Sequence, residues 1–99
     1  FEPPARPSMI LGKVIGTVVA TRKDERLVGS TLLLVQPVLP DGEARGGPIV
    51  AVDTVDAGAA ETVLVVSGSS ARMAAGQADR PIDAAIIGIV DVVSTNEAP

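Results

Sequence analysis

The sequence predicts an all-β domain, a small five-stranded barrel with one short helix. Short apolar runs of strand length, rich in Val, Ile and Leu, alternate with clusters of Gly, Pro, Asp and Ser that are typical of turns. An open sheet of so many valine-rich strands would expose unpaired edges to aggregation, and closure into a barrel removes them. The chain has 99 residues, which is the length of one domain with one core.

The first predicted strand is long and covers residues 10–22. Its even-numbered positions are all apolar or small, whereas its odd-numbered positions are mixed, so we expect one face to be fully buried. Gly12 and Gly16 lie on the apolar face. Because glycine has no side chain, the strand should bend there, or another backbone should approach closely.

Four further strands are expected after the charged turn at residues 22–26. They are bounded by turn signals such as Pro-Asp-Gly at residues 40–42, and they cover residues 31–38, 49–52, 62–66 and 84–93. Ser69 and Ser70 are expected to cap a short helix over residues 71–75 that stops at Gly76.

These elements define one domain over residues 9–93. The preceding residues 1–8 are rich in proline, and we expect them to be disordered. Residues 94–99 form a C-terminal tail.

Composition excludes several classes of function. Eight basic and twelve acidic residues give a net charge of −4, which disfavours nucleic acid and anionic membranes as partners. There is no cysteine, so disulfides and thiolate chemistry are excluded. No apolar run approaches the roughly 18 residues of a membrane span, and the N-terminal segment does not resemble a signal peptide. We therefore expect a soluble intracellular protein.

The residues that could carry catalysis are few, and we expect no enzyme activity and no cofactor. The chain has no histidine, so a Ser-Lys pair would have to use Lys13 or Lys23, which read more simply as solvated charges. Asp53, Asp56 and Glu61 could gather a hard cation, but they lack the spacing of a calcium loop. The favoured interpretation is that these acids accept hydrogen bonds from nearby backbone N–H groups in a turn, and no metal is expected.

Assembly remains as the function that the composition favours. The Gly-Ser-Ser run at residues 68–70, followed by Arg72, lacks the spaced glycines and the lysine of a phosphate-binding loop. A barrel of the oligonucleotide-binding (OB) kind normally offers aromatic platforms and a basic groove, and here Phe1 is the single aromatic residue. An aliphatic core without disulfides indicates that some apolar surface is covered by another copy of the chain.

Three segments together resemble a known family. They are GKVIGTVVATRKDERLVGSTLLLVQPV at residues 12–38, AVDTVDAGAAETVLVVSGSSAR at residues 51–72 and PIDAAIIGIVD at residues 81–91. Through them, residues 9–91 resemble the bacterial microcompartment vertex proteins of the EutN/CcmL type.

The resemblance implies a fold, an assembly and a function. It implies an OB-like five-stranded barrel that assembles into a tapered homopentamer. This pentamer would cap the vertices of a polyhedral shell in the cytoplasm, alongside hexameric shell proteins that tile the facets. An alternative is that the pentamer serves mainly as a pore for small metabolites or ions across the shell.

The central segment departs from the family pattern at two positions. Asp56 and Ala60 stand where the family commonly has glycine, whereas Asp53 and Glu61 are kept. If these positions need a positive φ, Ala60 would be strained by ~1 kcal/mol or more, and Asp56 by less, because Asp tolerates the left-handed region.

Three sets of candidate site residues follow from the resemblance. Subunit contacts, where space shrinks toward the fivefold axis, are expected at Asp53, Asp56, Ala57, Gly58, Ala60, Glu61 and Arg72. The rim of a narrow axial pore is expected at Ser67, Gly68, Ser69 and Ser70. Polar contacts with hexamers are expected at Lys13, Arg22, Lys23, Arg26 and Arg80. The alternative for the first two sets is solvent-exposed turns, and for the third it is solvated surface charge.

Overall fold

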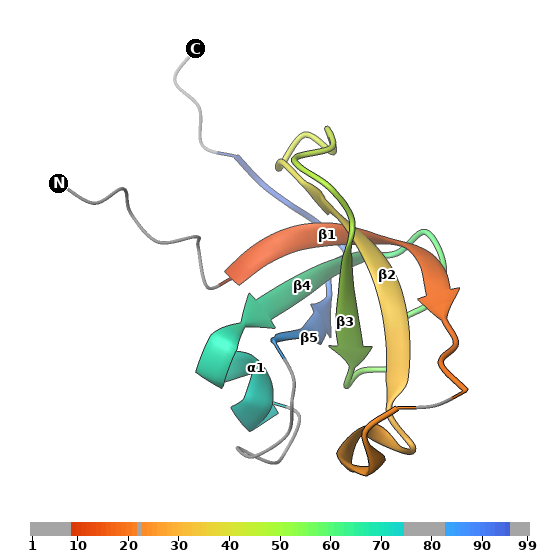
Figure 1. Cartoon of the computed structure of the whole chain (residues 1–99). Helices are drawn as coiled ribbons and strands as arrows, with labels where there is room; N and C mark the ends of the chain where they lie inside the picture. Colours follow the sequence, from red (N-terminus) through yellow and green to blue (C-terminus); the bar gives the residue numbers. More distant parts are fainter. Residues whose placement is uncertain (1–8, 22, 75–82, 96–99) are drawn as a thin grey trace, which may run out of the picture.

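The computed structural model describes residues 9–21, 23–74 and 83–95, and it shows a closed five-stranded barrel (Figure 1). The strand order around the barrel is β1-β2-β3-β5-β4. The strands are β1 (Met9–Val18), β2 (Thr31–Val38), β3 (Ile49–Asp53), β4 (Thr62–Ser67) and β5 (Ala84–Ile89). All neighbours are antiparallel except β3 and β5, which are parallel and pair at only two positions.

Two short helices accompany the barrel. The helix α1 (Gly68–Ala74) follows β4 directly and packs against β4 and β5. The 3-10 helix η1 (Glu25–Leu27) lies in the connection between β1 and β2. In the described part of the chain, no helix is both long and apolar enough to cross a membrane.

The five predicted strands and the short helix are confirmed, but the first and last strands end earlier than predicted, and three other strand ends differ by one residue. The first strand stops at Val18, where its pairing with Leu32 ends, and not at residue 22. The last strand stops at Ile89 and not at residue 93. Its partner β4 begins at Thr62, whose carbonyl accepts one more hydrogen bond from the Val90 N–H, and β4 has no residue to pair with those that follow. A β-strand ends where its partner ends, and no local sequence signal shows that.

The helix begins three residues earlier than predicted. Gly68 adopts a φ of 64° at the junction with β4, and its N–H donates to the Asp83 carbonyl at 3.0 Å. This left-handed glycine turns the chain directly from strand into helix, so Ser69 and Ser70 belong to the helix itself and do not precede it as caps. The predicted stop at Gly76 and the Pro-rich residues 1–8 lie outside the described residues.

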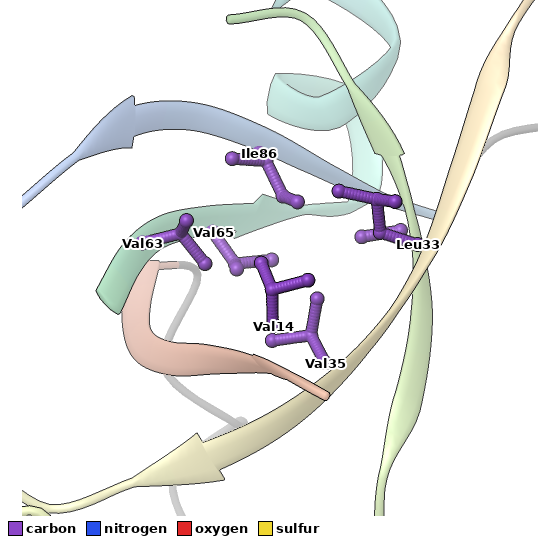
Figure 2. Close-up of a cluster of buried hydrophobic side chains, with 7 residues drawn as sticks. Val14, Leu33, Val35, Val63, Val65 and Ile86 are labelled. Carbon is purple, nitrogen blue, oxygen red and sulfur yellow. The ribbon is translucent and has the colours of Figure 1, made fainter. Parts of the chain in front are cut away.

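The core is entirely aliphatic and has two faces. Side chains that point into the barrel form the inner cluster shown in Figure 2, namely Val14, Leu33, Val35, Ala51, Val63, Val65 and Ile86. The strand residues next to them, Val52, Val66 and Ala85, point the other way and form a second cluster with Ala71 of α1. Full burial of one Val or Ile side chain stabilises a fold by about 1.5–3 kcal/mol. Because successive residues of a strand face opposite sides, both faces of the strands contribute such burial, and small aliphatic side chains are enough to form the core.

Gly12 and Gly16 of β1 play different parts. A Cβ on Gly12 would overlap Cγ1 of Val35. The sequence predicted a bend or the close approach of another backbone, and the nearest atom there belongs to a side chain. At Gly16 a Cβ would lie 3.7 Å from Leu34 Cβ, which is an ordinary contact. The β1–β2 register instead shifts between Val14 and Gly16, and the intervening Ile15 is 49% exposed. Such a bulge bends the strand, as barrel closure requires.

Candidate functional site

The loop between β3 and β4 is held by the two acids at its ends. Asp53 Oδ1 accepts a hydrogen bond from the N–H of Val55 at 3.0 Å, and Oδ2 accepts one from the N–H of Ala57 at 2.9 Å. At the far end, Glu61 Oε1 accepts a hydrogen bond from the N–H of Gly58. The structure therefore confirms the turn role that the sequence favoured for Asp53 and Glu61.

The same loop is fastened to the barrel on two sides. The N–H of Ala60 donates to the Val14 carbonyl at 2.9 Å, and the Val14 N–H donates to the Glu61 carbonyl at 3.0 Å. At the start of the loop, Thr54 donates from its hydroxyl to the Ile86 carbonyl at 2.7 Å. Val55 packs with Ala57 against the inner cluster. The loop thus covers part of the barrel core and has little freedom to move.

Two residues of this loop are left-handed without being glycine. Asp56 has a φ of 60° and Ala60 a φ of 68°. Both positions, where the family commonly has glycine, therefore adopt the positive φ that was in question. For an alanine, this conformation costs roughly 1–2 kcal/mol relative to glycine. The bonds on either side of Ala60 hold it there.

The acids of the loop do not form a metal cluster. Within the described ranges, no group of three or more carboxylate, imidazole or thiol side chains is placed to hold an ion. Asp53 and Glu61 direct oxygens at backbone N–H groups, and Asp56 is exposed.

The expected pore-rim residues lie at the other end of β4 from this loop (Figure 1). Ser67 is the last residue of β4, and residues 68–70 form the first turn of α1. Arg72, which was grouped with the subunit contacts, also belongs to α1. The structure therefore divides the candidates between two ends of one strand.

The basic residues expected to contact hexamers are exposed where the structure describes them, but their local hydrogen-bond and ion-pair partners differ. Lys13 lies on the outer face of β1, and Lys23 Nζ donates to the Ala20 carbonyl at 3.3 Å. Arg26 Nη2 lies 2.9 Å from Asp24 Oδ2. Hydrogen bonds from the Arg26 side chain and then from its backbone N–H lower the pKa of Asp24 to about 2. Arg22 and Arg80 lie outside the described residues.

An apolar groove is the feature that sequence reasoning missed. It has a volume of about 410 Å³ and lies between the start of β1, the end of β2 and the loop from β2 to β3. Its lining residues are Met9, Ile10, Leu11, Pro37, Val38, Leu39, Pro40, Arg45, Gly46, Gly47 and Ile49. These come from three separate segments, so no single motif could have revealed it.

A closed aliphatic five-stranded barrel with a braced β3–β4 loop places the described residues in the class of small β-barrel proteins. The model of the ethanolamine utilisation protein EutN/carboxysome family matches residues 9–91. The chain belongs to this family, and the resemblance found in its sequence is confirmed.

Relatives with known roles match over almost their whole length. The chain is 52% identical over 91 residues to the bacterial microcompartment shell vertex protein GrpN of Rhodospirillum rubrum, covering 88% of this chain and 98% of that protein. It is 49% identical to the carboxysome shell vertex protein CcmL of Synechocystis sp., covering 87% and 86%. The solved structure of the pentameric GrpN shell protein superposes with a TM-score of 0.80 at 49% identity, covering 88% and 99%.

Proposed function

We propose that this chain is a structural shell protein that forms a homopentamer and caps the vertices of a bacterial microcompartment in the cytoplasm. The observation that carries the proposal is the near full-length match to shell vertex proteins, with 98% of GrpN covered. The same closed barrel occurs in a pentameric shell protein, which supports the number of copies.

The work of such a protein is geometric. A flat sheet of hexagonal tiles cannot close, and pentagons placed at selected points introduce the curvature that seals the shell. Catalysis is no part of this role, and the sequence contains no histidine or cysteine to serve as a general base or a thiolate.

Subunit contacts form around the β3–β4 loop in this proposal. Its internal hydrogen bonds support the assignment, because a loop that is already ordered loses little conformational entropy when a neighbour docks. Small side chains there allow close approach of the next copy. The contact residues are Asp53, Asp56, Ala57, Gly58, Ala60 and Glu61, with Arg72 on α1 as a separate contact.

The other two sets complete the proposed vertex. Residues 67–70 border the axial opening, at the end of β4 that lies away from the loop. Hexamer edges are met by basic side chains through modest polar contacts, because exposed ion pairs contribute only about 0–1 kcal/mol each. These side chains are Lys13, Arg22, Lys23, Arg26 and Arg80.

The decisive experiment is shell closure in the presence and absence of this chain. Hexameric shell proteins are co-expressed with a fluorescent cargo, either alone or with the chain. Without any pentamer, we expect elongated or leaky shells that lose the cargo on dilution, and with the chain we expect closed shells that retain it. Electron microscopy and cargo release measure the two outcomes. Tight, closed shells in the complete absence of vertex pentamers would contradict the proposal.

A further inference from the structure

The chain after β5 carries apolar side chains that its own barrel leaves uncovered. The last backbone bond recorded there joins the Val90 N–H to the Thr62 carbonyl at 2.8 Å. Beyond it, residues 91–95 are all exposed, and Val92 is 78% and Val93 41% exposed. Figure 1 shows this segment leading away from the barrel. We call Asp91, Val92 and Val93 the arm.

The groove described above is already shaped for an occupant. Its loop wall is held by the Arg45 N–H, which donates to the Pro37 carbonyl at 2.9 Å, and by the Gln36 side chain, which donates to the Gly46 carbonyl at 2.9 Å. Its floor is aliphatic, and Met9 at one edge is 53% exposed. Preformed apolar clefts with a few placed polar groups are the usual form of a binding site.

The arm and the groove are complementary in charge as well as in polarity. Among the described residues that line the groove, Arg45 is the single charged one. The arm has one acid, Asp91, followed directly by its two valines. Within the described residues, the ion pair between Asp24 and Arg26 is the only one, so Arg45 and Asp91 have no ion-pair partner in that part of the chain.

We propose that the groove of each copy binds the arm of the neighbouring copy, with Val92 and Val93 on the aliphatic floor and Asp91 facing Arg45. The groove and the arm are different surfaces, so the contact is head-to-tail, and a head-to-tail contact closes into a ring when the rotation allows. This inference rests on the proposed homopentamer and names a contact that helps to hold it together.

The first test removes the complementarity and then restores it. The double variant Val92→Ser/Val93→Ser should raise the concentration at which the pentamer dissociates by about tenfold or more, because two buried side chains are lost. Arg45→Asp and Asp91→Arg should each raise it by roughly two- to fivefold, and the two together should recover most of the loss. Glu43→Arg, a charge reversal in the same loop but outside the groove lining, is the control and should have no effect.

Native mass spectrometry on a dilution series measures the dissociation, and circular dichroism reports the fold. If the wild type is a pentamer and the arm variants dissociate at the same concentration, the inference fails while the proposed function stands. If the wild type forms no pentamer, the proposed function itself fails.

The second test detects the contact directly and does not depend on a change in the stability of the pentamer. Because the chain has no cysteine, a pair can be introduced with Leu39→Cys and Val92→Cys. Mild oxidation should give covalent multimers of up to five copies on a denaturing gel. The control pair, Val92→Cys with Thr31→Cys at the opposite end of β2, should stay monomeric on the gel. A disulfide within one chain, or none, would overturn the inference.

Discussion

Ala60 has a backbone conformation that its side chain disfavours. Its φ is 68°, and the chain holds it there with a hydrogen bond from its N–H to the Val14 carbonyl. The sequence indicated possible strain at this position, because Ala60 stands where the family commonly has glycine. The sign of φ, however, depends on how the loop docks on β1, which only the structure shows.

We predict that Ala60→Gly stabilises the protein. Relief of left-handed strain should exceed the extra entropy of glycine in the unfolded chain, for a net gain of about 0.5–1 kcal/mol in the free energy of unfolding. Urea denaturation at a fixed protein concentration measures it. The control is Ala59→Gly, since Ala59 is not left-handed, and it should destabilise slightly. If both variants behave alike, Ala60 carries no strain.

Gly58 tests whether the loop meets a neighbouring copy. We predict that Gly58→Trp abolishes the pentamer and leaves a β-rich monomer, because a bulky side chain would separate the subunits. Native mass spectrometry and circular dichroism give the two readings. Gly58→Ala is the matched control, because its Cβ would lie 3.3 Å from Glu61 Oε1 and needs only a small shift. An intact pentamer of the Trp variant would refute this placement of the loop.

Among the elements, η1 depends on one exposed acid. Asp24 Oδ1 accepts hydrogen bonds from the N–H and the Nε of Arg26, and Oδ2 accepts one from Nη2. These bonds lower the pKa of Asp24 from 3.8 to about 2. A lowered pKa means that the charged form favours the folded turn. Its contribution is therefore complete above pH 3.8 and is lost as the pH falls toward 2.

We predict that Arg26→Gln returns the pKa of Asp24 toward 3.8. The turn should then lose its cap at a higher pH than in the wild type. A carbon-13 NMR titration of the Asp24 carboxyl measures the change directly. Lys23→Gln removes one positive charge from the residue next to Asp24 and should leave the titration of the Asp24 carboxyl unchanged. A wild-type-like titration in the Arg26 variant would show that the pairing is absent in solution.

The strands show how far local patterns reach. The predicted residues 31–38 coincide with β2, because both ends of that run are marked by turn residues. Val92 and Val93 extend an apolar run with good strand propensity, yet they are not paired, because β4 has no residue left to pair with them. Propensity specifies which segments form strands, and partner length specifies where they stop.

The whole molecule leaves apolar surface that a single barrel does not cover. Large aliphatic side chains are exposed at several sites besides the arm, among them Ile15, Val50 and Met73. This agrees with the expectation from composition that another copy covers part of the surface. It also means that folding and assembly should be linked.

We predict that the thermal midpoint of unfolding rises with protein concentration. Mass action favours the assembled form, so a hundredfold increase in concentration should shift the midpoint upward by several degrees. Differential scanning fluorimetry with an extrinsic dye measures it across a dilution series. The Gly58→Trp monomer is the control and should show a constant midpoint. A midpoint that is independent of concentration in the wild type would separate folding from assembly.

The sequence by itself determined the class of fold, the aliphatic core, the family and the turn roles of Asp53 and Glu61. These follow from alternation, turn residues and motifs within short stretches of chain. The tertiary structure alone decided the strand ends and the left-handed backbone of Asp56 and Ala60. It alone also formed the groove beside Arg45. Each of these depends on contacts between segments far apart in the sequence, which no local pattern encodes.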